Sequence, residues 1–232
     1  MRSHAVFITG TDTGVGKTVV TALLLAHLRA RGRPAIAMKP ISCGDRHDAH
    51  LFHGLADCRV PFDRINPIHF QKPLAPLAAA RMERRHWDVA IVQSAFCSLG
   101  STFSPVLVEG IGGLLVPLKR GYAVADMVKD LRLPLLIVAR PGLGTLNHTA
   151  LTVEAARSRG IRVLGIIFNS ASGRAPDLAE RTNAKVIEQV CSVKLLGRFP
   201  YISMAEDRVS SIRSAAQSKI IQRCCSAVEK VL

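Results

Sequence analysis

The chain is 232 residues long, carries a formal net charge of +14, and is 48% hydrophobic and 21% charged. This composition indicates a globular protein with one buried core, and no run of about 18 or more apolar residues offers a membrane helix. The N-terminus shows neither the apolar segment nor the small-residue cleavage site of an export signal, so we expect a cytoplasmic protein with no membrane partner.

The positive charge is compatible with nucleic acid or with small anionic substrates as partners. Lysine and arginine are scattered along the chain, and the tightest cluster, at 81–86, has only Trp87 as a local aromatic residue. A nucleic-acid groove would interleave cations with several aromatic side chains. We therefore expect a solvated helix face there and no nucleic-acid partner. The six cysteines form no C-x-x-C pair and are expected to be reduced.

Short apolar runs alternate with longer amphipathic stretches along the chain, which predicts an α/β fold. We expect a parallel, doubly wound sheet with helices on both faces, in one domain spanning residues 1–232. The expected strands are 5–9, 35–38, 106–108, 135–139, 163–168 and 194–198, and the expected helices are 16–31, 75–85, 88–99, 124–131, 145–159, 177–191 and 215–231. The stretch at about 42–71 is too long for a simple connection and is expected to be a functional loop.

The sharpest motif, Gly-Thr-Asp-Thr-Gly-Val-Gly-Lys-Thr at 10–18, lies between the first expected strand and helix. It indicates a phosphate-binding loop, as in P-loop NTPases, with backbone amides facing the phosphates of ATP. Lys17 can reach the β- and γ-phosphates and Thr18 can bind magnesium. The loop is one residue longer than the usual consensus, because Thr11 stands where the first glycine would be. Its nucleotide-binding residues are Gly14, Val15, Gly16, Lys17 and Thr18.

Several polar residues follow other strands at the same expected sheet edge, where open α/β sheets bind ligands. Glu109 closes an apolar strand before a glycine-rich turn, and we expect it to bind Mg²⁺ together with Thr18. Asp48 is a second candidate ligand, although it could equally cap a helix, and Asp45 is its competitor. Lys39 ends a strand and points to the same edge.

The loop at 10–18 resembles the opening of dethiobiotin synthases, and four further segments agree with that family in order and spacing. They are Lys-Pro-Ile-Ser-Cys-Gly at 39–44, Val-Glu-Gly-Ile-Gly-Gly at 108–113, Gly-Leu-Gly-Thr-Leu-Asn-His at 142–148 and Gly-Ile-Ile-Phe-Asn at 165–169. The resemblance covers roughly residues 4–202 and is weak beyond them.

This resemblance implies an ATP- and Mg²⁺-dependent ligase that takes 7,8-diaminononanoate and carbon dioxide or bicarbonate and closes a ureido ring. The family places a magnesium-binding aspartate near Asp48. It also implies that Lys17, Lys39 and Thr13 serve catalysis, and that Asp12 and Thr13 face the diamine and its carbamate. Positioning and charge neutralisation would carry such a reaction, because the substrate supplies both attacking groups.

The remaining implied contacts concern the ends of the two substrates. The family match gives Asn169 an adenine contact and places Cys43, where many relatives have serine, and Gly112 at the diamine site. The family also uses the segment Gly144, Thr145, Leu146 and Asn147 to receive the substrate tail from the neighbouring subunit, which implies a homodimer. Helix capping is the alternative role for Thr145 or Asn147.

The alternative function is a partition-type or regulatory P-loop ATPase that binds DNA or a protein partner. Proteins of that class have a phosphate loop that resembles K-G-G-x-G-K-T. In this chain, Asp12 stands where the signature lysine of that loop would be. An amidotransferase-type ligase of cobalamin synthesis would need a glutaminase domain, for which this chain has no room.

Overall fold

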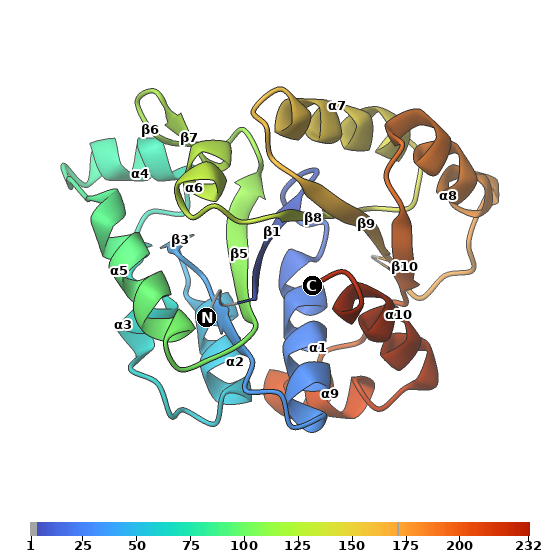
Figure 1. The fold of residues 1–232 in the computed structure, drawn as a ribbon, viewed down its shortest axis with the longest axis horizontal. Coiled ribbons are helices and arrows are strands. Elements are labelled where there is room, and N and C mark those ends of the chain that lie inside the picture. The colour runs from blue at the N-terminus through green and yellow to red at the C-terminus, as the bar shows by residue number, and fades with distance from the viewer. Residues whose placement is uncertain (1–3, 171) are drawn as a thin grey trace.

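A computed structural model describes residues 4–170 and 172–232 of the chain (Figure 1). Residues 1–3, part of the segment on which the expectation about an export signal rests, lie outside the described part. A six-stranded parallel sheet runs through the molecule in the order β10-β9-β8-β1-β5-β2. Its strands are β1 (Ala5–Gly10), β2 (Ile36–Met38), β5 (Val106–Gly113), β8 (Leu135–Ala139), β9 (Val163–Asn169) and β10 (Leu195–Phe199).

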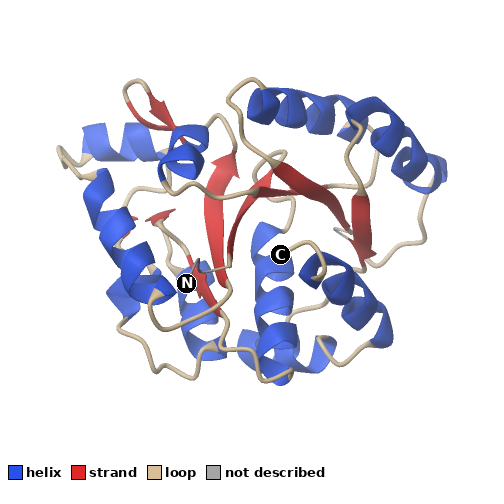
Figure 2. Cartoon of the chain, in the orientation of Figure 1, coloured by secondary structure: helices blue, strands red, loops and turns tan. Residues whose placement is uncertain are grey.

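Helices cover both faces of this sheet, as the alternating pattern predicts (Figures 1 and 2). Helices α1, α9 and α10 lie on one side and α6, α7 and α8 on the other. The helices are α1 (Lys17–Ala30), α2 (His47–Leu55), α3 (Phe62–Ile65), α4 (Pro76–Met82), α5 (Val89–Gly100), α6 (Val124–Asp130), α7 (Thr145–Arg157), α8 (Leu178–Cys191), α9 (Arg208–Ala215) and α10 (Lys219–Glu229). In the part of the chain that the structure describes, no helix is long and apolar enough to cross a membrane.

The centre of the sheet is formed around strand β1. Strand β1 pairs with β5 on one side and β8 on the other, and Phe7 and Ile8 are fully buried. β-Branched and aliphatic residues suit strands that are covered on both faces. Because all six strands are parallel, their carboxyl ends meet at one edge of the sheet, where the phosphate-loop motif follows β1.

The stretch 42–71 is not the long loop expected from its composition. It contains most of strand β3 (Ile41–Cys43), helices α2 and α3, and strand β4 (Ile68–Phe70), which pairs with β3. Helix α2 buries Leu51, Phe52 and Leu55, so an apolar face is present among its polar residues. Helices α2 and α3 were not predicted because the segment is rich in His, Asp and Arg. A short helix of this composition can still form when one of its faces is apolar and packs on the core.

The expected helix at 215–231 is present as α10, which begins later, and a separate helix that was not expected, α9, precedes it. Helix α9 ends at Ala215 and α10 begins at Lys219, with turn hydrogen bonds from Gln217 N to Ser214 O and from Ser218 N to Ala215 O. Ser218 adopts the extended backbone of a residue that precedes a helix. A short hairpin, β6 (Pro117–Lys119) and β7 (Tyr122–Ala123), was also not expected.

Candidate active site

The phosphate loop connects the end of β1 to the start of α1. Gly14 and Gly16 both have positive φ, 74° and 86°, a conformation that glycine adopts at little cost. Gly16 precedes α1, and no side chain caps this helix N-terminus. The first amides of the helix are therefore free to bind an anion, and the helix dipole favours negative charge there.

Asn169 fixes the loop from the neighbouring part of the sheet. It ends β9, is buried, and donates a hydrogen bond from Nδ2 to the carbonyl of Val15 at 3.2 Å. A Cβ atom at Gly16 would lie 2.0 Å from this Nδ2 atom. The glycine is thus needed for two reasons, its backbone conformation and the close approach of Asn169.

Three charged side chains meet beside the phosphate loop, from the residue after β2, from within β5 and from the first turn of α2. The Nζ atom of Lys39 lies 2.6 Å from Oε1 of Glu109 and 2.8 Å from Oδ2 of Asp48. Thr18 donates from Oγ1 to the same Glu109 oxygen at 2.9 Å. Residues that are distant in the chain are thereby brought to one point beside the phosphate loop, and Lys17 lies in the same cleft.

The electrostatics of this cluster follow from burial and pairing. Burial alone would lower the pKa of Lys39, but the carboxylates of Glu109 and Asp48 outweigh it and the pKa is raised. Burial would raise the pKa of Asp48, whereas Lys39 and the hydroxyl of Thr18 lower it. Lys17 differs, because burial lowers its pKa more than Glu109 raises it.

One oxygen of Glu109 is available for a metal ion. The side chain is fully buried, and its Oε2 atom has no hydrogen-bond partner among the described residues. A buried carboxylate oxygen without a partner is costly unless something else satisfies it. Within residues 4–170 and 172–232, no group of three or more His, Cys, Asp or Glu side chains could hold a metal alone. The donor set of Glu109, Asp48 and the Thr18 hydroxyl instead fits a magnesium ion that also binds phosphates and waters.

The competing carboxylate, Asp45, lines the same cleft but contacts other groups. Its Oδ1 atom accepts a hydrogen bond from the amide of His47 at 3.0 Å, at the start of α2. Asp48 lies in the first turn of that helix and contacts Lys39 instead. The geometry therefore gives Asp45 the capping-type contact and puts the Asp48 carboxylate into the charged cluster.

A cleft of about 800 Å³ opens over this cluster. Of the expected site residues, Thr13, Gly14, Gly16, Lys17, Thr18, Lys39, Cys43, Asp48 and Gly112 line it. Glu109 lies beneath it, bonded to Lys39 and Thr18. Asp12 is at the loop itself, where its carbonyl accepts from Lys17 Nζ at 3.0 Å and its carboxylate lies 3.5 Å from Arg140. Burial raises the pKa of the Cys43 thiol to about 11, so it is a neutral thiol near neutral pH.

Sequence reasoning missed Arg208 as a lining residue of the cleft. It is the first residue of α9, and its charge helps to lower the pKa of Asp48, which lines the same cleft. The segment lies beyond the motifs that carry the family resemblance, so no spacing pointed to it. The sequence signal that could have indicated helix α9 is Asp207, a residue type that often caps helices. Its carboxylate accepts a hydrogen bond from the amide of Ser210 at the start of α9.

The segment at 144–147 stands apart from the cleft. Gly144 and Asn147 are exposed, whereas Thr145 is buried with its hydroxyl 3.3 Å from that of Thr149. Leu146 is partly buried against the core. This segment does not line the phosphate cleft of its own chain.

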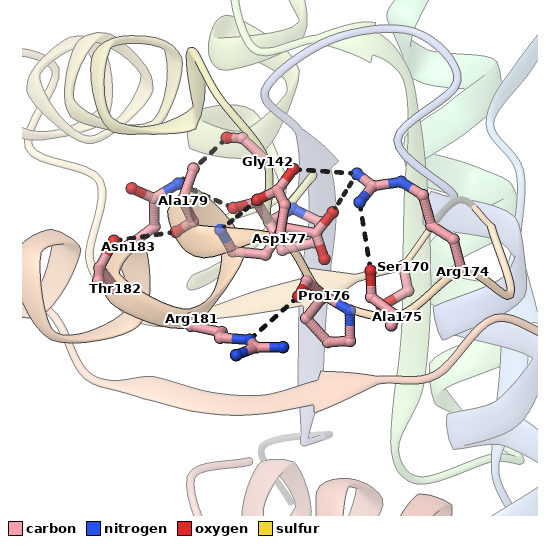
Figure 3. Close-up of polar contacts among 12 residues, drawn as sticks. Gly142, Ser170, Arg174, Ala175, Pro176, Asp177, Ala179, Arg181, Thr182 and Asn183 are labelled. Atoms are coloured by element: carbon pink, nitrogen blue, oxygen red, sulfur yellow. Dashed lines mark hydrogen bonds and ion pairs between the residues drawn. The ribbon is translucent and has the colours of Figure 1, made fainter.

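Polar contacts from α8 hold the turn before that segment and the chain after Asn169 (Figure 3). Asn183 donates to the carbonyls of Pro141 at 2.9 Å and Gly142 at 3.2 Å. Glu180 pairs with Arg174 at 2.6 Å and also with Arg198. These bonds fix the ends of two neighbouring strands relative to each other.

The fold and the loop define a P-loop ATPase. A family model described as an AAA domain matches residues 4–208. The cell-division ATPase MinD of Pyrococcus furiosus has a similar structure, with a TM-score of 0.64, 19% identity and coverage of 99% of this chain and 100% of that chain. A ParA-family ATPase from Chlorobium tepidum gives a TM-score of 0.60 at 15% identity, covering 98% of this chain and 99% of that one. At these identities the likeness shows the fold alone.

The chain belongs to the dethiobiotin synthetase family within that class. It is 42% identical to the ATP-dependent dethiobiotin synthetase BioD of Anaeromyxobacter sp. strain Fw109-5, over 94% of this chain and 99% of the relative. It is 40% identical to the protein of the same name from Thermodesulfovibrio yellowstonii, over 85% of this chain and 88% of the relative. The family expected from the motifs is thus confirmed.

Gly16→Ala is expected to lower the free energy of unfolding by about 2 kcal/mol or more, because it adds backbone strain and a clash with Asn169. Gly14→Ala is the matched control, since Gly14 also has positive φ but a Cβ there meets nothing within 4 Å. We expect it to cost only about 1 kcal/mol. Urea unfolding followed by circular dichroism measures both values, and equal costs would contradict the role of Asn169.

Asp48 is expected to make stability depend on pH in the acid range. Its folded pKa is below its ordinary value of 3.8, so its contribution is present above that pH and is lost as pH falls through the folded pKa. The stability advantage of the parent over Asp48→Asn should therefore shrink between pH 6 and about pH 3. Urea unfolding at both pH values tests this, and a constant difference would show that Asp48 is not paired in solution.

Proposed function

We propose that this chain is an ATP- and Mg²⁺-dependent dethiobiotin synthetase, a ligase of biotin synthesis that converts 7,8-diaminononanoate and carbon dioxide to dethiobiotin. Membership of the family supports the activity. The observation that carries the assignment for this chain is the charged cluster beside the phosphate loop, in which buried Lys39 pairs with buried Glu109 and with the partly exposed Asp48. It provides both the carboxylates for a metal and a cation for the transferred phosphoryl group.

The proposed chemistry needs no side-chain nucleophile. One amine of the substrate takes up carbon dioxide and loses a proton to form a carbamate. The carbamate oxygen attacks the γ-phosphorus of ATP, so that ADP leaves and a carbamic-phosphoric mixed anhydride forms. The second amine then attacks the carbamoyl carbon, phosphate leaves, and a five-membered ureido ring closes. Positioning and charge neutralisation carry such a sequence.

The residues for these tasks lie around one cleft. Lys17 and Lys39 would neutralise the phosphates and the carbamate as charge moves from the γ-phosphoryl group to ADP. Arg208 adds a third cation to the lining of the cleft. Thr18, Glu109 and Asp48 would hold Mg²⁺. When it is bound, this ion would neutralise negative charge on the β- and γ-phosphates.

The substrate contacts and the assembly are the less direct parts of the proposal. Asp12, Thr13, Cys43 and Gly112 would face the diamine, and Asn169 the adenine side. The segment 144–147 would receive the substrate carboxylate from a second subunit, in a homodimer. Two features favour this, the position of the segment outside its own cleft and the 96% exposure of the neighbouring Leu143. We place this reaction in the cytoplasm, without DNA or membrane partners.

Incubation with ATP, Mg²⁺, bicarbonate and 7,8-diaminononanoate should yield the ureido product, detected by mass spectrometry. Lys17→Ala should reduce turnover by a factor of about 100 or more, because it removes a cation that neutralises the phosphates. Circular dichroism should show an unchanged fold. Undiminished turnover in this variant, or no ureido product from the parent, would refute the assignment.

Asp48→Asn and Asp45→Asn form a matched pair that tests the metal site. The first removes a carboxylate charge beside Lys39 and Glu109, and the second removes one that contacts the amide of His47. We expect Asp48→Asn to raise the Mg²⁺ concentration for half-maximal turnover about tenfold, and Asp45→Asn to leave it nearly unchanged. The reverse order would move the metal ligand to Asp45.

A further inference from the structure

A basic hollow lies outside the phosphate cleft, between helix α4 and strand β6, which pack side by side (Figure 1). Its volume is about 490 Å³, within the size range of small-molecule sites. The basic side chains that line it are Arg81, Arg84, Arg85, His86, Lys119 and Arg120. This is the cluster that the sequence suggested was a solvated helix face, joined in space by two cations from the hairpin.

The charge of this hollow is not compensated by acidic groups. No carboxylate lines it, and the two acidic residues of the same segment are used elsewhere. Glu83 accepts from the amide of Lys72 at 2.8 Å, and Asp88 accepts from the amide of Ala90 at 3.0 Å and caps α5. Among the ion pairs of the described residues, none includes a lysine or arginine of the hollow. Like charges held together without counter-charges repel, and an anion would relieve this repulsion.

Arg84 carries one of these charges on an unfavourable backbone. It follows the last turn of α4 with φ of 48°, a position at which glycine usually ends a helix. A residue with a Cβ atom adopts this conformation at a cost in free energy. Arg84 therefore lines the hollow at a position where glycine would suit the backbone better.

The lining of the hollow includes a buried donor that has no acceptor among the described residues. Trp87 is 9% exposed, and its indole Nε1 has no hydrogen-bond partner among the described residues. The ammonium group of Lys119 lies 4.3 Å from the centre of the Trp87 ring. Trp87 therefore contacts a cation that an incoming anion would attract, and its fluorescence should report such an event.

We propose that this hollow is a second anion site that binds a small polyphosphate group. Guanidinium groups form paired hydrogen bonds with phosphate oxygens, and several cations suit a multiply charged anion better than a single carboxylate. The concave shape and the burial of the one aromatic residue argue against a nucleic-acid strand, which needs an extended track and exposed rings for stacking. This site is distinct from the phosphate loop and does not depend on the proposed ligase activity.

The test is a titration of the full chain with inorganic tripolyphosphate at fixed ionic strength, followed by tryptophan fluorescence. Trp87 is the only tryptophan of the chain, so the tryptophan signal reports changes in the surroundings of this one residue. Arg84→Gly should weaken binding about tenfold, since it removes a charge-assisted contact. Its melting temperature should be equal to or above that of the parent, because glycine suits the backbone there.

Arg132→Gly is the matched control. Arg132 is also an exposed arginine with positive φ, 53°, and it lies outside the hollow. This variant loses the same charge and the same backbone strain, so we expect its affinity to stay within about twofold of the parent. The response should also persist in Lys17→Ala, which disables the phosphate loop.

Three results would overturn the proposal. Equal weakening in Arg84→Gly and Arg132→Gly would mean that the anion responds only to overall charge. Loss of the signal in Lys17→Ala would mean that the tryptophan reports the phosphate loop. A response to single-stranded DNA with none to tripolyphosphate would make the hollow part of a nucleic-acid surface.

Discussion

The pairing of buried Lys39 with Glu109 and Asp48 is the constraint around which the site is arranged. Removing these groups from water is costly, and the cost is offset only when each charge has close partners of opposite sign. Lys39 follows β2, Glu109 lies in β5 and Asp48 lies in α2, so the pairing fixes three elements relative to one another. The remaining Glu109 oxygen has no partner among the described residues, and the same cluster that stabilises the fold is therefore suited to bind a cation.

The phosphate loop depends on a second constraint, the close contact between Gly16 and Asn169. This contact links the nucleotide loop to β9, whose following segment is held by the ion pairs of Glu180 with Arg174 and Arg198. The loop amides are thus oriented before any ligand binds, and pre-organised donors lose little free energy on binding phosphate. Phosphoryl transfer in which the protein supplies no nucleophile depends on positioned charges. The rigid loop amides and the paired Lys39 provide such charges.

The high positive charge has more than one structural context. Some cations are neutralised in ion pairs, as Arg29 and Arg213 are by Asp57. Others surround the phosphate cleft, and a third group lines the hollow between α4 and β6 without acidic partners. The charge is therefore organised locally, which fits small anionic ligands better than one continuous surface for a polyanion.

Local patterns in the sequence determined the strands of the main sheet, most of the helices, the phosphate loop and the family. These features depend on neighbouring residues, because apolar periodicity and glycine spacing act over a few positions. Sequence reasoning also named Lys39, Asp48 and Glu109, but it left Asp45 and Asp48 as alternatives. It missed α2, α3, α9 and the hairpin, whose short segments carry weak periodic signals.

Only the tertiary structure placed Asp48 rather than Asp45 against Lys39, brought Arg208 to the cleft, and joined Lys119 and Arg120 to the arginines in and after α4. Such contacts join residues far apart in the chain, and their positions depend on how whole elements pack, which no local pattern encodes.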